Sequence, residues 1–401
     1  MIVLSGADLV MPGGVQPEST VVLEGERIAD VRTGTTRDAR ALDVRGHFVL
    51  PGFIDVHVHG LEGIDTLDGE AAVAAIAGRL TKYGVTAFCP TTVACAPAAL
   101  RQVLTSVAAL RASPVAKGMA RVLPAHLESN FINPDYRGAQ PIECLRLPGA
   151  LGAPGPTGAT GATAFEARDV LAEIDAAGAD VGIVTLAPEL EGALELIRHL
   201  VGRGRRVSLG HSGATLEQSR AAIDAGARHA THLFNRMPPL DHREPGLAGA
   251  VLTSDEVAAE VICDGVHVHR DMVRMAIAAK GPRRVMAITD GVSAAGLPDG
   301  ATASLGGRTI RVMKSAAYLE DGTRAGSVAT MDRVFRFLVK DAGLSMSDAA
   351  RLCASTPASE LALPDTGTIA KGAVADLVVL DRNLNVTHTY VGGRLAWSVR
   401  P

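Results

Sequence analysis

Short apolar runs alternate with longer amphipathic stretches through the middle of the chain. Eight of the runs have the length of a buried strand, and they lie at 52–57, 85–91, 121–128, 181–187, 205–210, 228–232, 257–263 and 284–290. Stretches with apolar residues at helical spacing follow many of them, at 70–82, 97–111, 166–177, 189–202, 215–225 and 327–341. This alternation of strand and helix is typical of βα units in an α/β protein, and eight strands predict a (β/α)8 barrel of the TIM type over residues 52–362.

Both ends of the chain show a different pattern. Residues 1–51 alternate apolar and polar positions with frequent Gly and Pro, and the same pattern returns in residues 363–401. Such alternation predicts short strands joined by tight turns. We therefore expect the two ends to meet in one small β-sandwich domain beside the barrel.

Polar clusters end five of the eight predicted strands. They read Asp55-Val56-His57-Val58-His59, His126-Leu127-Glu128, Gly210-His211-Ser212, Thr231-His232-Leu233 and Thr289-Asp290-Gly291. A barrel gathers the C-terminal ends of its strands around one opening, so residues that are distant in sequence would meet there. The placement of these clusters favours a barrel over a doubly wound open sheet.

Histidine and glutamate are the main residues of these clusters. His57 and His59 are two residues apart on a strand, so their side chains point to the same side. Glu128, His211 and His232 each follow a separate strand. A lone buried histidine is more often structural, but imidazole and carboxylate groups at several strand ends are the ligands expected for Zn²⁺ or a similar divalent ion. We predict that these five residues bind one or two such ions.

Asp290 ends the last predicted strand. From there its carboxylate could accept a proton from an attacking water and return it to a leaving amine, which is general acid–base catalysis of hydrolysis. The alternative is an aspartate that caps the following turn.

Composition narrows the class of protein. The 401 residues are 47% apolar, enough for a large core, and the net charge of −4 gives no basic field for nucleic acid. The five cysteines form no C-x-x-C pair, which indicates reduced thiols. No signal-peptide pattern opens the chain, and no apolar run approaches the roughly 20 residues that span a bilayer. We expect a cytoplasmic protein that binds neither nucleic acid nor membrane.

The opening strand, from Pro51 to Gly60, resembles that of the amidohydrolase superfamily. Further motifs make the chain similar to the N-acetylglucosamine-6-phosphate deacetylase family along nearly its whole length. They are His126-Leu127-Glu128, Thr185-Leu186-Ala187-Pro188-Glu189, Gly210-His211-Ser212, Thr231-His232-Leu233-Phe234-Asn235, Arg243-Glu244-Pro245-Gly246, Asp264-Gly265-Val266-His267, Thr289-Asp290-Gly291 and Ala325-Gly326-Ser327.

The resemblance implies a role for each metal ligand and for Asp290. Glu128, His211 and His232 would hold the principal ion, with His57 and His59 available for a second. The ion would be Zn²⁺, with Fe²⁺, Mn²⁺ and Co²⁺ as the alternatives. Asp290 would be the catalytic acid–base.

The resemblance also implies a substrate site and a homodimer. Asn235, the residue after it and His267 would bind the sugar and its phosphate, and Gly326 lies in a motif of the same site. An arginine from the neighbouring subunit would grip the phosphate, and the matching residue is Arg243. Without the resemblance, Arg243 would be taken as a solvated surface charge.

Three departures from the family pattern lie close together. Gln140 stands where the family usually has a histidine that polarises the substrate carbonyl, and glutamine donates only a neutral hydrogen bond. Arg236 replaces a small residue beside the expected phosphate position. A Gly-rich insertion at 149–163 follows them, and we expect a flexible loop near the pocket mouth rather than a collagen-like helix.

The sequence thus predicts a metal-dependent hydrolase that removes the acetyl group of N-acetylglucosamine 6-phosphate. Because of the departures, an enzyme for N-acetylgalactosamine 6-phosphate or another N-acyl amine is an alternative. A catalytically silent barrel that serves as a binding protein is a third, although every expected ligand and Asp290 are present.

Overall fold

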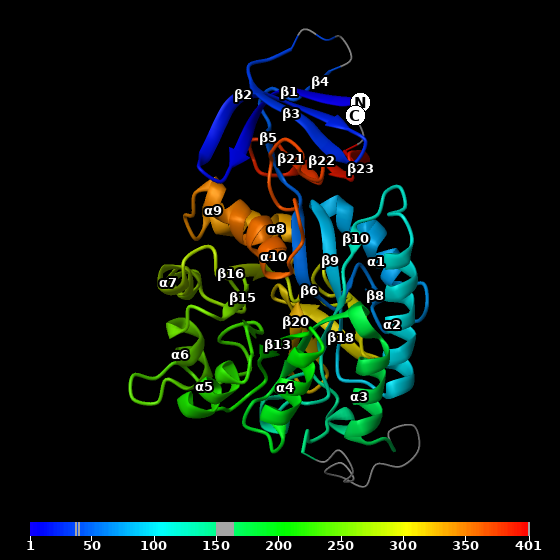
Figure 1. Ribbon diagram of the computed structural model, residues 1–401, viewed down its shortest axis with the longest axis vertical. Coiled ribbons are helices and arrows are strands. Elements are labelled where there is room, and N and C mark those ends of the chain that lie inside the picture. Colours follow the sequence, from blue (N-terminus) through cyan, green and yellow to red (C-terminus); the bar gives the residue numbers. More distant parts are fainter. Residues whose placement is uncertain (37, 39–40, 150–163, 400–401) are drawn as a thin grey trace.

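A nearly closed parallel barrel forms the centre of the molecule. The computed structural model describes residues 1–36, 38, 41–149 and 164–399 (Figure 1). The barrel strands are β6 (Phe53–Val58), β9 (Val85–Thr92), β11 (Ala125–Glu128), β12 (Val181–Leu186), β13 (Arg206–Leu209), β14 (His229–Ala230), β15 (Ala258–Ile262) and β16 (Val285–Ile288). All eight coincide with predicted runs, although the third run is split, with β10 (Arg121–Val122) preceding β11. The predicted fold class is confirmed.

The last strand meets the first at the C-terminal end of the barrel. The His59 amide donates to the Gly291 carbonyl at 2.7 Å, and the Asp290 amide donates to the His57 carbonyl at 3.0 Å. These bonds place the segment that carries Asp290 directly beside the segment that carries the histidine pair. Closure of the barrel therefore also assembles the predicted site.

Helices surround the barrel strands (Figure 1). They are α1 (Ala72–Leu80), α2 (Pro97–Ala112), α3 (Ala167–Ala176), α4 (Ala193–Gly202), α5 (Leu216–Asp224), α6 (Gly246–Thr253), α7 (Arg270–Lys280), α8 (Met331–Lys340), α9 (Met346–Ala350) and α10 (Thr356–Glu360). Helix α8 buries Met331, Val334, Phe335 and Leu338, the spacing of one helical face. Helices α6, α7, α9 and α10 were absent from the predicted set.

The two ends of the chain share one sheet at one end of the molecule, where both termini lie (Figure 1). Its order is β23-β22-β21-β5-β1-β2-β3, with β4 paired to β1. The strands are β1 (Ile2–Met11), β2 (Gly14–Glu24), β3 (Arg27–Thr33), β4 (Leu42–Asp43), β5 (Phe48–Pro51), β21 (Leu377–Leu380), β22 (Val386–Val391) and β23 (Arg394–Ser398). Strand β5 pairs with β21 across more than 320 residues of sequence, since Leu50 lies opposite Val378. The prediction that the terminal segments meet is confirmed.

A four-stranded antiparallel sheet follows β16 and was not predicted. It consists of β17 (Thr302–Leu305), β18 (Arg308–Met313), β19 (Ala316–Leu319) and β20 (Arg324–Ser327). Two-residue turns with positive φ join its first three strands, at Gly306-Gly307 and at Lys314-Ser315. The strands that these turns connect are too short to give a clear pattern in the sequence. A shorter hairpin of β7 (Gly60–Leu61) and β8 (Ile64–Asp65) lies after β6.

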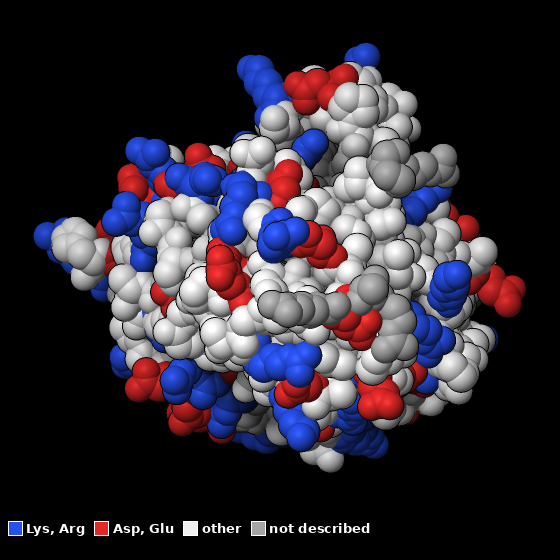
Figure 2. Space-filling model, turned by 90° about the horizontal axis from the view of Figure 1, so that it is seen from above, with Lys and Arg blue, Asp and Glu red and all other residues white. Residues whose placement is uncertain are grey.

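Charged side chains of both signs are interspersed on the face seen from the end that carries the sheet of the two chain termini (Figure 2).

All five cysteines are buried and unpaired. No helix in the described ranges combines the length and the hydrophobicity that a membrane crossing requires. The predicted loop at 149–163 lies outside the described residues, apart from Gly149.

Candidate active site

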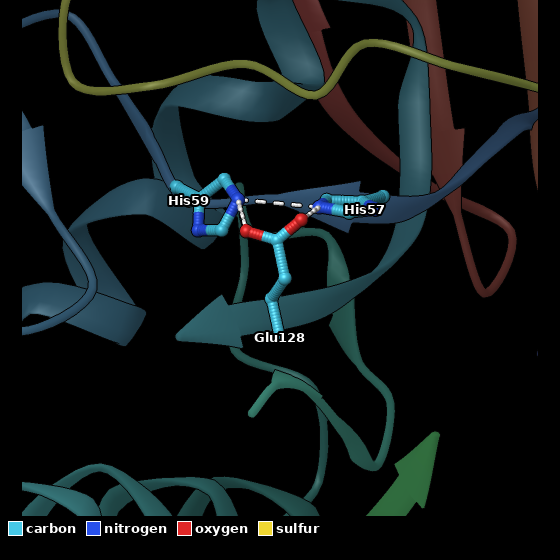
Figure 3. A group of neighbouring side chains, drawn as sticks. All are labelled: His57, His59 and Glu128. Carbon is cyan, nitrogen blue, oxygen red and sulfur yellow. Dashed lines mark hydrogen bonds and ion pairs between the residues drawn. The ribbon is translucent and has the colours of Figure 1, made fainter. Parts of the chain in front are cut away.

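The strand ends bring the five predicted ligands into one buried cluster. Glu128 Oε1 lies 2.8 Å from His211 Nε2 and 2.9 Å from His232 Nε2. The histidine pair of the first strand lies slightly farther away. Glu128 Oε2 is 3.5 Å from His59 Nε2, and Glu128 Oε1 is 3.7 Å from His57 Nε2. Figure 3 shows His57 and His59 pointing at this carboxylate, which is shared by both halves of the cluster.

Strained backbone at the loop starts directs several of these side chains inward. His211, His232 and Asp290 have φ values of 50°, 30° and 49°, in a region that residues other than glycine rarely adopt. Each of them lies two residues after the last residue of a barrel strand. Strain of this kind persists where the surrounding structure enforces it, and it is concentrated at functional sites.

The donor set fits a divalent metal ion. His57 Nε2 lies 3.2 Å from His59 Nε2, and His211 Nε2 lies 3.1 Å from His232 Nε2. Tetrahedral zinc with Zn–N bonds of about 2.1 Å holds neighbouring nitrogen atoms roughly 3.4 Å apart, so these contacts are close to the spacing of ligand edges. Among the described residues, three groups of three possible ligands lie within 4.8 Å of one another: His57, His59 and Glu128; Glu128, His211 and His232; and His57, His126 and Glu260. The first two consist of predicted ligands and share Glu128.

Electrostatics keep the central carboxylate ionised. Burial opposes ionisation of Glu128, but the charge and hydrogen bonds of His211 and the bond from His232 hold its pKa well below the ordinary value. Burial also disfavours a charged His232, yet Glu128 outweighs it and raises that pKa to about 9. At His57 burial dominates and lowers the pKa to about 3, so this imidazole is neutral. A bound divalent ion would displace the proton that Glu128 favours on His232.

Asp290 faces the histidine pair. Its Oδ1 lies 3.4 Å from Nε2 of both His57 and His59. Burial opposes ionisation of Asp290, but the hydrogen bond from His59 and the nearby His57 lower its pKa. The carboxylate is therefore ionised and able to accept a proton beside the predicted ions.

Glu260 on β15 belongs to the site and was missed by the sequence analysis. Its Oε2 lies 2.9 Å from Nδ1 of His57, the ring nitrogen that faces away from the cluster, and both side chains are fully buried. A carboxylate behind a ligating imidazole fixes its tautomer and increases its basicity. The available signal was a single charged residue inside the apolar run 257–263.

We expect Glu260→Gln to weaken metal binding at the His57 and His59 half of the cluster by about 10- to 100-fold, because the imidazole loses its charged partner. Titration of the metal-free protein with Zn²⁺ measures this loss. Glu256→Gln, an exposed carboxylate just before the same strand, is the matched control. Identical titrations of Glu260→Gln and wild type would contradict the assigned role.

Gln140 lies against the metal cluster, with its amide engaged. The Gln140 Nε2 group donates to Glu128 Oε2, and its Oε1 accepts from the Ala94 amide at 2.7 Å. The side chain is only 4% exposed, although it lines the pocket. In this arrangement Gln140 orients a predicted metal ligand, and the second N–H of its amide is available to a substrate carbonyl.

A cavity of about 560 Å³ opens beside the cluster and contains most of the predicted substrate residues. Asn235, Arg236, His267 and Gly326 all line it, together with His59, Glu128, Gln140, His211, His232 and Asp290. The unpredicted sheet supplies part of the wall through Leu305, Tyr318, Thr323 and Arg324. The ligand cluster, Asp290 and these substrate residues thus face one space.

His267 presents one ring nitrogen that has no hydrogen-bond partner among the described residues. Its Nδ1 lies 2.7 Å from Asp264 Oδ2, while its Nε2 is buried without a hydrogen-bond partner. Because Asp264 fixes the ring, Nε2 is available to a bound molecule. Gly326 has φ +77°, and a Cβ there would lie 2.5 Å from Val292 and 3.1 Å from the Asp290 carbonyl oxygen, so a side chain would disturb the Asp290 loop.

Arg243 is the one predicted residue that lies apart from the site. It is exposed in the loop before α6 and does not line the cavity of its own chain. Its amide donates to Asp241 Oδ1 at 2.7 Å. Within one chain, then, the structure does not bring Arg243 to the substrate residues.

Comparison with known proteins gives consistent matches. The amidohydrolase family model matches residues 48–396. The N-acetylglucosamine-6-phosphate deacetylase of Rattus norvegicus is 38% identical over 97% of this chain and 94% of its own, and that of Lysinibacillus sphaericus is 32% identical over 98% and 97%. Among solved structures, the deacetylase of Thermotoga maritima is 31% identical, with a TM-score of 0.85 over 99% of this chain and 100% of its own. A mutant of the Mycobacterium smegmatis deacetylase, in complex with N-acetyl-D-glucosamine-6-phosphate, is 32% identical, with a TM-score of 0.87 over 99% of both chains.

Proposed function

This chain belongs to the amidohydrolase family, among the N-acetylglucosamine-6-phosphate deacetylases, and we propose that its cavity hydrolyses the acetamide of N-acetylglucosamine 6-phosphate. The products are glucosamine 6-phosphate and acetate. One observation carries the proposal: Glu128, His211 and His232 converge within hydrogen-bond distance, and Asp290 faces the same cavity.

Members of the family depend on a metal, and this donor set fits one. Glu128, His211 and His232 would hold the principal ion, and His57 and His59 with the shared Glu128 would hold a second. A divalent ion supplies a polarised carbonyl and a water of lowered pKa when bound. Zn²⁺ is our first choice because imidazole and carboxylate ligands in this number suit it, while Fe²⁺, Mn²⁺ and Co²⁺ accept the same donors.

The protein's own residues move the proton and position the substrate. Asp290 accepts a proton from the attacking water and donates it to the amine as the C–N bond breaks, so the carboxylate is unchanged after each cycle. The His267 Nε2 group and Asn235 hold the sugar so that its acetamide faces Glu128 and Asp290. Gln140 fixes the orientation of Glu128 and can offer its second N–H to the carbonyl oxygen as negative charge develops.

We propose a homodimer in which Arg243 reaches the cavity of the neighbouring subunit. The support is its exposed position outside its own cavity and its place in the motif that begins Arg243-Glu244-Pro245-Gly246. A guanidinium there would meet the phosphate of the substrate with paired donors.

Rates of acetate release from three compounds test the substrate assignment. We expect the zinc-loaded protein to act on N-acetylglucosamine 6-phosphate with kcat/KM at least about 10-fold above that for N-acetylgalactosamine 6-phosphate or N-acetylglucosamine, because the site holds both the sugar hydroxyls and an anion. Gln140 and Arg236 make the galactosamine compound the second candidate. Equal rates with and without phosphate would contradict the proposal, and a protein that binds zinc but releases no acetate would be a silent barrel.

A further inference from the structure

Arginines from separate segments gather on the wall of the cavity. Arg236 follows β14, and Arg324 begins β20 of the unpredicted sheet; both line the cavity. They are in contact, since Arg236 Nη2 donates to the Arg324 carbonyl oxygen at 2.9 Å. A third, Arg137, lies in the loop after β11 and is close enough to affect the pKa of Arg236. We call Arg236 and Arg324 the arginine pair.

Backbone geometry holds the Arg236 side chain in this place. It crosses Gly138, where a Cβ would lie only 2.4 Å from Arg236 Nε and 2.8 Å from Cζ. Gly138 also has φ +59°, which suits glycine. The loop after β11 therefore leaves room for this guanidinium, which reaches the cavity wall from the opposite loop.

No carboxylate neutralises the arginine pair within the described ranges. Neither Arg236 nor Arg324 makes an ion pair within 4.0 Å, whereas the surface arginines Arg101 and Arg203 each have one. Burial and then the charge of Arg324 lower the pKa of Arg236, and the charges of Asp290 and Glu128 offset this only in part. Two half-buried cations in contact, with no carboxylate paired to either within 4.0 Å in the described residues, favour an anion beside them.

A phosphate monoester fits this site chemically. Guanidinium groups present paired N–H donors that match two phosphate oxygens, and two of them balance a dianion. Among the described residues the pair donates to two carbonyl oxygens, from Arg236 to Arg324 at 2.9 Å and from Arg324 to Val266 at 3.3 Å, so other N–H groups remain for a ligand. The ligand cluster and the arginine pair line the same cavity, so one molecule can reach both.

We propose that the arginine pair binds the phosphate of the substrate from within the same chain. This rests on the proposed deacetylase function and gives the chain a phosphate contact that does not require Arg243 of a neighbouring subunit. Arg236 and Arg324 are specificity-determining residues: they set the preference for a phosphorylated sugar and take no part in cleaving the amide.

Kinetics of Arg236→Gln and Arg324→Gln test the proposal. For N-acetylglucosamine 6-phosphate we expect KM to rise about 10-fold in each single variant, with kcat changed less than about 3-fold, because the lost contact is equal in ground and transition states. For N-acetylglucosamine without phosphate, kcat/KM stays at the wild-type value. Arg236→Lys recovers part of the loss, since it restores the charge without the paired donors.

Two controls separate this effect from misfolding and from the neighbouring subunit. Arg311→Gln, an exposed arginine of the same sheet, is expected to match wild type, and each variant is checked for an unchanged melting temperature. Arg243→Gln is measured in parallel. If only Arg243→Gln loses the preference for phosphate, or if the pair variants lose activity equally on both sugars, the proposal is overturned.

Calorimetric binding distinguishes failure of this proposal from failure of the proposed function. Glucosamine 6-phosphate and inorganic phosphate are titrated into wild type and into the double variant Arg236→Gln/Arg324→Gln, with no turnover needed. We expect the Kd for both compounds to rise at least about 10-fold in the double variant. Unchanged affinity would overturn the arginine-pair proposal even if the enzyme deacetylates its substrate. A large loss of affinity would support the proposal even if no acetamide is cleaved.

Discussion

Replacing Asp290 with asparagine is expected to lower kcat for deacetylation by about 10²- to 10⁴-fold, the usual contribution of a positioned acid–base group. Asparagine keeps the shape of the side chain but cannot take a proton from water or deliver one to the amine. The ligands Glu128, His211 and His232 are untouched, so the variant should keep its ion.

Steady-state acetate release, together with metal content by mass spectrometry, checks this expectation. Asp299→Asn, an exposed aspartate in the loop after the same strand, serves as the control and should match wild type. Asp290→Asn with near wild-type turnover would remove Asp290 from the mechanism. A variant that has lost its ion would show that Asp290 acts as a ligand instead.

Replacing Glu128 with glutamine has the second large expected effect. Glu128 is common to the two groups that consist of predicted ligands, so a neutral amide in its place should weaken both halves of the cluster at once. We expect turnover to fall below detection. We also expect the variant to lose the stabilisation that Zn²⁺ gives wild type, which is about 2.7 kcal/mol at a concentration of 100 times Kd.

Thermal unfolding with and without added zinc measures that stabilisation directly. Glu143→Gln changes an exposed carboxylate in the loop after the same strand and should leave the zinc effect intact. Equal zinc stabilisation of Glu128→Gln and wild type would show that the ion binds elsewhere.

The convergence of the predicted ligands could be predicted from the sequence because a barrel brings the ends of successive strands together. His57 and His59 end the first strand, and His232 ends the sixth, yet all three reach one carboxylate. The fold rule that strand ends converge supplied the missing geometry. The same rule explains why the apolar runs that define β6 to β16 located the site without any distance information.

Contacts that depend on details of packing could not be predicted in this way. Glu260 is 203 residues from His57 in sequence, and only the strand order of the barrel places their side chains 2.9 Å apart. The Gln140 amide could equally have faced the substrate, and its bond to Glu128 follows from the path of the loop after β11. The contact between Arg236 and Arg324 depends on a sheet that the sequence pattern left unassigned.

The identity of the reaction is tested most directly by tracing the oxygen of water. Zinc-loaded protein is incubated with N-acetylglucosamine 6-phosphate in ¹⁸O-labelled water, and both products are analysed by mass spectrometry. Hydrolysis at the acetamide carbonyl places one labelled oxygen in acetate and leaves glucosamine 6-phosphate unlabelled, and this is the result we predict. No acetate, or release of phosphate from a sugar whose acetamide stays intact, would contradict the assignment of this cavity as a deacetylase site.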